Sequence, residues 1–241
     1  MTAGGAFAPL RIKPSDLTPP SGFAAGRVEL LEIYRRLRAA RGPLHWWPAR
    51  TPFEVALGAI LTQNTAWSNV ERALDNLRRA RSLSFRGLLR LKRARLEQLL
   101  RPSGYFRQKA ARVERFLHLI RDEYGGSPAR LFAQPLEVLR PRLLAVNGIG
   151  PETADSICLY AAGHKVFVVD TYTRRLVLRH GLMDGKLTYD ALQVFFQQRL
   201  PLDAELYNDF HAQIVILGKD HCRARARCEG CPLEALPHDY R

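Results

Sequence analysis

The residues with the clearest chemical potential form a short turn and a carboxylate that follows it. The turn reads Val146-Asn147-Gly148-Ile149-Gly150-Pro151, with apolar periodic stretches on both sides. Two glycines around one apolar residue permit a tight turn, and Pro151 suits the first position of a helix. Such a helix–hairpin–helix exposes backbone N–H groups that can bind a phosphate without reading sequence. Asp170 follows within reach of that site, where it could activate water or simply cap the next helix.

The charge of the chain predicts a polyanionic partner. Its formal net charge is +14, and most of the excess is arginine, which forks phosphate oxygens bidentately. A GC-rich genome would also favour arginine over lysine, but it does not explain the net charge. With 46% hydrophobic and 25% charged residues, the chain is typical of soluble globular proteins. Because no apolar run approaches the ~20 residues of a membrane span and no secretory signal begins the chain, we expect a cytoplasmic protein without membrane association.

The elements that must position these residues are helices. Helical spacing of apolar residues occurs in the ranges 28–37, 53–61, 67–78, 84–91, 95–100, 108–124, 132–146, 151–162, 171–180, 189–200 and 204–218. Only Val166–Val169 resembles a strand, and we interpret it as a buried connection. Residues 1–26 are rich in Gly, Ala and Pro and predict a flexible lead-in. The sequence therefore predicts an all-α fold.

The hairpin followed by Asp170, on a basic helical chain, resembles the DNA glycosylases of the helix–hairpin–helix superfamily, the endonuclease III and alkylpurine glycosylase group. The resemblance extends from about Ala25 to the C-terminus and implies two helical lobes with a DNA-binding cleft between them. The implied central lobe is 52–162, and the second lobe is 27–51 plus 163–241 with a C-terminal cysteine loop. It also implies a cytoplasmic, nucleoid-associated monomer whose partner is double-stranded DNA containing damaged bases.

The resemblance makes Asp170 the catalytic carboxylate. Departure of a base leaves positive charge on the sugar, which a carboxylate can stabilise while it activates the incoming water. Bifunctional endonuclease III carries a lysine where this chain has Glu152, and that amine attacks the sugar to form a Schiff base. Without it, we expect a monofunctional glycosylase with doubtful AP lyase activity. Glu152 then lines the substrate pocket or serves as a structural carboxylate near the helix N-terminus.

Two further segments resemble the parts of the family that distort DNA. In Leu61–Thr65, here called the plug loop, Gln63 would enter the base stack beside Asn64 and pair with the orphaned base. In the turn before residue 106, Tyr105 would intercalate as a wedge, and the stretch from Arg107 to Lys109 would contact the DNA backbone. Ordinary turn chemistry at helix ends is the alternative for Gln63 and Tyr105. The hairpin residues expected to bind DNA are Asn147, Gly148, Gly150 and Thr153.

The preferred substrate follows from the run His45-Trp46-Trp47-Pro48. Trp46 or Trp47 could stack on a flipped base, and a cationic alkylated purine would gain roughly 0.5–2 kcal/mol from a cation–π contact. With the plug loop and Glu152, this run resembles the 3-methyladenine glycosylase branch more than endonuclease III. The alternative is that both tryptophans only close the interface of the lobes.

The C-terminal cysteines suggest a metal centre with an incomplete ligand set. Cys222, Cys228 and Cys231 resemble the iron–sulfur loop of the endonuclease III group, but the first gap is one residue shorter and Pro237 stands in the place of the fourth cysteine. A [4Fe–4S] cluster normally takes four thiolates. The resemblance predicts such a cluster with another fourth ligand (His221, His238 or Asp239) or an open iron; the alternatives are no cofactor and a vestigial or zinc-like site.

Two other functions compete with an alkylated-purine glycosylase. One is an endonuclease III-type glycosylase and AP lyase acting on oxidised pyrimidines, which would require the amine that the hairpin lacks. The other is a non-catalytic protein that binds damaged DNA, which would have no need of Asp170.

Overall fold

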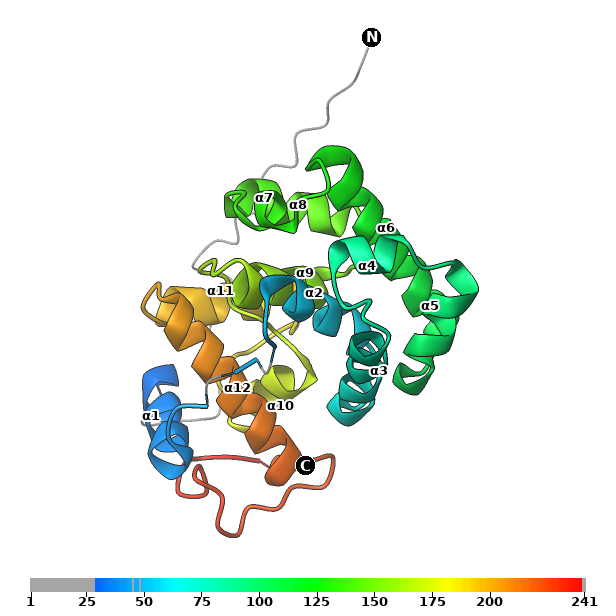
Figure 1. Ribbon diagram of the computed structural model, residues 1–241. Coiled ribbons are helices and arrows are strands. Elements are labelled where there is room, and N and C mark those ends of the chain that lie inside the picture. Colours follow the sequence, from blue (N-terminus) through cyan, green and yellow to red (C-terminus); the bar gives the residue numbers. More distant parts are fainter. Residues whose placement is uncertain (1–28, 45, 48, 240–241) are drawn as a thin grey trace. The chain divides into compact units, whose positions relative to one another are not determined.

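A computed structural model describes residues 29–44, 46–47 and 49–239, and within them the regular elements are helices, with no strand (Figure 1). The predicted all-α class is confirmed. The elements are α1 (Leu30–Arg41), α2 (Pro52–Leu61), α3 (Trp67–Arg79), α4 (Phe85–Leu89), α5 (Arg93–Leu100), η2 (Arg101–Ser103), α6 (Phe106–Glu123), α7 (Pro128–Phe132), α8 (Leu136–Leu144), α9 (Pro151–Ser156), the π-helical η3 (Ile157–Ala161), α10 (Thr171–Arg179), α11 (Tyr189–Arg199) and α12 (Ala204–Asp220). The expected lead-in, residues 1–26, lies outside the described residues, as do His45 and Pro48.

The described chain divides into two compact units. The larger unit contains residues 43–168 and 201–213, and the smaller contains 29–42, 169–200 and 214–239. These bounds place the described residues of 43–51 and the first half of α12 with the hairpin, whereas the resemblance implied that they belong to the other lobe. The hairpin, the plug loop and the two tryptophans thus share the larger unit, and Asp170 and the cysteine loop share the smaller one.

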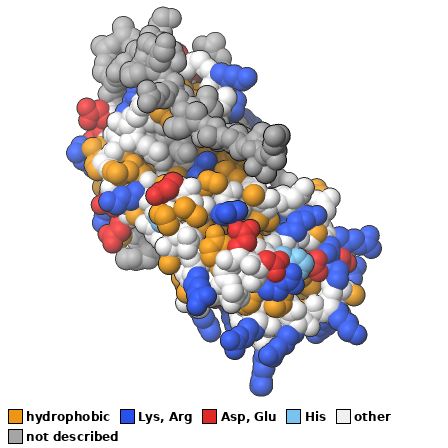
Figure 2. Space-filling view, turned by 90° about the horizontal axis from the view of Figure 1, so that it is seen from above, with side chains coloured by type: hydrophobic (Ala, Val, Ile, Leu, Met, Phe, Trp, Pro, Cys, Tyr) orange, Lys and Arg blue, Asp and Glu red, His pale blue; other side chains and the backbone are white. Residues whose placement is uncertain are grey.

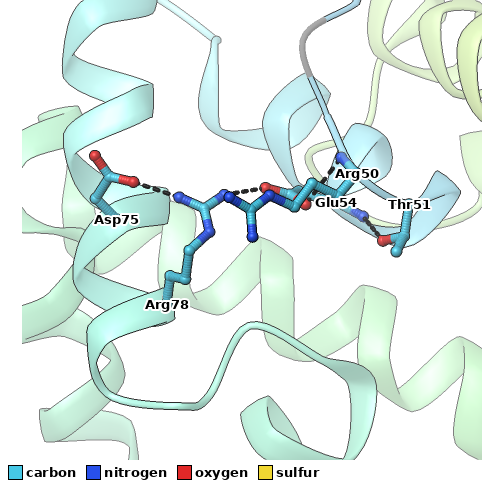
Figure 3. A network of polar contacts seen from close by, with 5 residues as sticks. All are labelled: Arg50, Thr51, Glu54, Asp75 and Arg78. Carbon is cyan, nitrogen blue, oxygen red and sulfur yellow. Dashed lines mark hydrogen bonds and ion pairs between the residues drawn. The ribbon is translucent and has the colours of Figure 1, made fainter.

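Helix α2 forms the core of the larger unit. Its residues from Phe53 to Leu61 are all buried, and it contacts α3, α6, α9 and η3. Its start is anchored by the buried carboxylate of Glu54, which accepts hydrogen bonds from Arg78 of α3 and from the Arg50 backbone N–H at 3.1 Å, while Thr51 caps the helix (Figure 3). This network fixes α2 and therefore the plug loop that follows its last residue.

One predicted helix is shorter than its apolar periodicity indicates. The expected helix over 132–146 corresponds to α8, which begins only after Pro135 and ends at Leu144, and Phe132 is the last residue of α7. Pro135 adopts an extended backbone conformation (φ −62°, ψ 156°) at the start of α8. Proline has no N–H to donate and disfavours helical geometry in the residue before it, so apolar periodicity alone overestimates the length of this helix.

The segment between η3 and α10 has no regular structure. Val166–Val169 is buried throughout, with exposed fractions of 0–4%, which confirms the buried connection expected there. It leads directly to Asp170 and so fixes where α10 begins.

Within the described ranges, no helix has the length and apolar character needed to cross a membrane.

Candidate nucleic-acid interface

The hairpin between α8 and α9 has the backbone geometry of a phosphate-binding turn. Gly148 has φ +96°, which disfavours any residue with a side chain, and Gly150 is extended (φ −91°, ψ 178°) at the N-cap of α9. The Ile149 N–H is used internally, donating to the Val146 carbonyl at 2.9 Å. Within the described chain, the N–H groups of Gly148 and Gly150 donate to no protein acceptor. Both remain available for an anion.

Gln63 of the plug loop bonds to this hairpin. Its Nε2 donates to the Gly148 carbonyl at 3.0 Å and to the Thr153 hydroxyl at 2.8 Å. Its Oε1 accepts a hydrogen bond from Arg112 of α6, a residue that sequence reasoning missed. Thr153 is buried and turned toward Gln63, whereas Asn64 beside it is exposed in the left-handed region (φ 53°). The structure therefore brings the expected plug and the expected hairpin residues together.

The wedge turn, Gly104–Tyr105, stands at the start of α6. Tyr105 is 64% exposed and adopts the left-handed conformation (φ 44°, ψ 33°), so it remains accessible at the surface. Lys109 differs from expectation: it is fully buried and its Nζ donates to the Ser103 carbonyl at 2.6 Å. Burial and the neighbouring Arg112 lower the pKa of Lys109 to about 8. Lys109 thus supports the wedge turn from beneath and does not present its ammonium group to the surface.

Arginines surround the wedge and the hairpin. On α6, Arg107 and Arg115 are exposed, and the Arg115 guanidinium donates to the Asn147 carbonyl at 3.2 Å. Lys and Arg side chains crowd the right-hand side of the face in Figure 2, the side on which α5 and α6 lie in Figure 1. Such a surface supplies the sequence-independent attraction that a polyanion needs.

Asp170 is the N-cap of α10 in the smaller unit. Its Oδ1 accepts a hydrogen bond from the Thr173 N–H at 2.7 Å and another from the Thr173 hydroxyl at 2.9 Å. The alternative role considered for this residue, helix capping, is therefore present. Capping does not exclude catalysis, because the helix N-terminus stabilises the ionised carboxylate that a general base requires.

Glu152 lies in the first turn of α9, next to the hairpin, and is exposed. Behind it, the fully buried Asp155 accepts two hydrogen bonds from Arg140 of α8, at 2.6 and 3.1 Å. This ion pair joins the two helices of the motif, and sequence reasoning missed it because Arg140 looks like one more surface arginine.

The two tryptophans belong to an aromatic cluster. The ring of Trp47 lies 5.1 Å from Tyr160 at an interplanar angle of 39°, and 5.1 Å from Trp67 in an edge-to-face arrangement. Trp46 packs edge-on against Trp47 at 6.4 Å. Close packing of Trp47 on α2 requires a glycine at position 58, because a Cβ on Gly58 would lie 3.1 Å from the indole nitrogen. The contacts of Trp47 are thus internal to the larger unit, and Trp67 and Tyr160 are further aromatic residues of the same group.

The three cysteines of the C-terminal loop line one pocket of the smaller unit, together with His180, His221 and His238. The Cys222 sulfur accepts a hydrogen bond from Arg179 at 3.1 Å, and burial raises the pKa of the Cys228 and Cys231 thiols. The fourth cysteine of the chain, Cys158, is buried in the other unit, and burial raises its pKa to about 12.

The donor set of this pocket does not fit a four-thiolate cluster. Pro237 offers only its carbonyl, which bonds to His180 Nδ1 at 2.9 Å. Over the described ranges, no group of three or more His, Cys, Asp and Glu side chains is arranged to hold a metal ion. The residues present therefore do not supply the four thiolates that a [4Fe–4S] cluster normally takes.

Residues 57–201 match the model of the HhH-GPD superfamily of base excision DNA repair proteins. Among individual proteins, the chain is 42% identical to MJ1434 of Methanocaldococcus jannaschii, which carries a provisional assignment as a DNA repair glycosylase. That alignment covers 85% of this chain and 94% of the relative.

Solved structures share the fold. The 3-methyladenine DNA glycosylase MagIII of H. pylori, bound to 1,N6-ethenoadenine, superposes with a TM-score of 0.67 at 31% identity, over 80% of this chain and 98% of that one. A non-covalent endonuclease III–DNA complex superposes with a TM-score of 0.74 at 21% identity, over 88% and 95% of the two chains, and speaks for the fold alone.

Proposed function

This chain belongs to the HhH-GPD superfamily of base excision DNA repair proteins, and we propose that within it the chain is a monofunctional DNA glycosylase for alkylated purines. In this proposal, the hairpin binds the DNA backbone, Gln63 and Tyr105 support the distorted duplex, and Asp170 activates the water that releases the base. The proposal that the enzyme is monofunctional rests on Glu152. Its exposed carboxylate stands at the first turn of α9, where a lyase needs an amine.

Lys109 does not supply the missing amine. A lysine whose pKa is lowered to about 8 would be reactive in an open site. Here the Nζ atom is buried and donates to the Ser103 carbonyl, so a sugar carbon cannot approach it. Water is therefore the nucleophile in the proposed reaction, and release of the base leaves an intact abasic strand.

The aromatic cluster supports the choice of an alkylated purine. Trp46 and Trp67 lie beside Trp47 and are half-buried, so neither residue is fully enclosed by the larger unit. A cationic purine would gain roughly 0.5–2 kcal/mol from an aromatic face. The likeness to MagIII, whose structure contains an ethenoadenine, points to the same class.

Asp170→Asn tests the mechanism. Asparagine still caps a helix, so the fold should persist while base release falls at least ~100-fold and affinity for DNA with an abasic-site analogue stays unchanged. The matched control is Asp203→Asn, since Asp203 caps the start of α12 through the N–H groups of Glu205 and Leu206, at 2.7 and 3.0 Å. Asp203→Asn should release base at the rate of the unaltered protein. Unchanged base release by Asp170→Asn would refute the assigned role.

The substrate is tested with duplexes that carry either alkylated purines or thymine glycol, scored with and without hot alkali. We expect release of 3-methyladenine and strand nicking only after alkali. Nicking of thymine-glycol DNA without alkali would support an endonuclease III-type lyase instead. Tight binding of both duplexes without any base release would support the non-catalytic alternative.

A further inference from the structure

Arg112 of α6 connects the plug loop to the hairpin. Its guanidinium donates to Gln63 Oε1, and the amide nitrogen of Gln63 donates both of its hydrogens, to the Gly148 carbonyl and the Thr153 hydroxyl. An amide nitrogen has two donors, so both donors of Gln63 are in use. Gln63 cannot pair with an orphaned base while it keeps these contacts. Entry of Gln63 into a duplex therefore requires that the contacts with the hairpin and Arg112 be broken.

Arg112 also lies directly along the turn that would receive a phosphate. If Gly148 carried a Cβ, that atom would be 2.7 Å from Cγ and Nε of Arg112 and 2.9 Å from Cδ. The side chain is half-buried, so part of its guanidinium surface remains accessible. The Gly148 and Gly150 N–H groups and the Arg112 guanidinium are thus donors gathered around one turn.

The charge of Arg112 has no carboxylate to neutralise it. No ion pair of the described chain includes Arg112 or Arg115, and both donate to neutral oxygens, those of Gln63 and Asn147. Other arginines nearby do have acidic partners: Arg121 pairs with Asp122, for example. A guanidinium bound to a neutral amide oxygen gains a negatively charged partner, which it can bind bidentately, when a phosphate replaces that oxygen.

We propose that Arg112 binds a DNA backbone phosphate and that this exchange releases Gln63 into the duplex. In the free protein, Arg112 holds Gln63 against the hairpin. On DNA, a phosphodiester at the Gly148 turn takes the place of the Gln63 oxygen on the guanidinium, and the amide becomes free to pair with the orphaned base. The inference rests on the proposed function, since it requires the hairpin to bind DNA and Gln63 to act as the plug.

The salt dependence of binding tests the phosphate contact. The probe is a duplex with a non-hydrolysable abasic-site analogue, titrated at several salt concentrations. Arg112→Ala should weaken binding roughly five- to tenfold and reduce the slope of log affinity against log salt by about one. Arg112→Lys should keep that slope, because it retains the charge. The control Arg121→Ala, at the exposed far end of the same helix, should change neither quantity; an unchanged slope in a folded Arg112→Ala protein would overturn the proposal.

The exchange itself is tested with a double-mutant cycle on the same duplex. If binding to DNA breaks the Arg112–Gln63 contact, the unaltered protein loses part of its binding free energy in breaking it. Each single variant already lacks the contact and does not bear that cost. The double variant Gln63→Ala/Arg112→Ala should then lose affinity by roughly two- to tenfold more than the product of the two single losses. A loss equal to or below that product would mean that the contact persists on DNA, and the proposal would be wrong.

The outcomes distinguish this inference from the proposed function. The binding measurements need no base release, so they stand whatever the catalytic activity proves to be. If the unaltered chain shows no salt-dependent binding to the duplex, the proposed function fails. If it binds and releases alkylated purines while Arg112→Ala matches it in slope and affinity, only the role of Arg112 fails.

Discussion

Different kinds of interaction stabilise the hairpin and the cysteine loop (Cys222–Cys231). Side-chain contacts hold the hairpin: those of Gln63, of Arg115 and of the Arg140–Asp155 ion pair. The cysteine loop is held mainly through its backbone. Arg179 of α10 donates to the carbonyls of Arg223 and Ala224 at 2.7 and 2.8 Å.

This difference predicts which residues can be substituted in each region without loss of its conformation. At the hairpin, the identities of Asp155, Gly148 and Gln63 determine the conformation, so substitutions should affect structure and binding together. In the loop, Arg175 and Arg179 donate to backbone carbonyls that any residue would provide. The cysteine side chains can therefore vary without loss of the loop conformation, consistent with an incomplete cysteine set.

The largest effect is expected at the ion pair inside the motif. Asp155→Asn leaves the Arg140 guanidinium, 26% exposed, without its counter-charge, and should lower the free energy of unfolding by about 3 kcal/mol. Chemical denaturation measures this value. Asp122→Asn, which breaks an exposed pair with Arg121, serves as the control and should change stability far less. Equal effects of the two variants would show that the buried pair is not a principal support of the hairpin.

Removal of Arg179 should disturb the cysteine loop next most strongly. Arg179→Ala deletes the two hydrogen bonds to the loop carbonyls and one to the Cys222 sulfur, and should cost about 2 kcal/mol. Limited proteolysis would detect the loosened loop as faster cleavage between residues 221 and 239. Resistance equal to that of the unaltered protein would contradict backbone support by Arg179.

The two glycines of the hairpin form a matched pair. Gly148→Ala places a Cβ at φ +96° and against Arg112, so it should lower the free energy of unfolding by about 1–2 kcal/mol and also weaken DNA binding. Gly150 has φ −91° and open space around it. Gly150→Ala should therefore leave the melting temperature unchanged and weaken only DNA binding, because the methyl group obstructs a phosphate. A comparable loss of stability in both variants would rule out this distinction.

Lys109 should make stability depend on pH in an identifiable range. Because burial lowers its pKa from 10.5 to about 8, the folded chain loses this proton at a pH where the unfolded chain still holds it. The free energy of unfolding should therefore rise from pH 8 to 10.5, relative to that of Lys109→Met. Denaturation curves of both proteins at pH 7.5 and 9.5 measure the difference. A difference that falls as the pH rises would contradict the assigned shift.

The smallest effect is expected from the cysteines themselves. Replacement of Cys222, Cys228 and Cys231 by serine should leave the rate of base release unchanged, because the loop depends on its carbonyls. The anaerobically purified protein should contain much less iron than a [4Fe–4S] cluster requires, as measured by iron assay and absorbance near 400 nm. A brown protein whose activity is lost with its iron would overturn this expectation.

Local pattern sufficed for most of the fold and for part of the candidate site. Apolar periodicity predicted the helices because each must bury one face, and it failed between residues 132 and 136, where Pro135 interrupts the pattern. The left-handed Gly148 and the cap by Asp170 could also be predicted, since a tight turn and a helix start depend on neighbouring residues.

Contacts between distant residues could not be predicted in this way. Gln63 meets Arg112 and Thr153 across 49 and 90 positions, and no spacing rule connects them. Lys109 looks like a surface cation, and only the packing of α6 over Ser103 buries it. The sequence by itself determined the helices, the hairpin and the family, because short-range sterics and periodicity encode them. Tertiary structure alone decided which polar groups form hydrogen bonds with distant residues, because those contacts depend on which helices pack together.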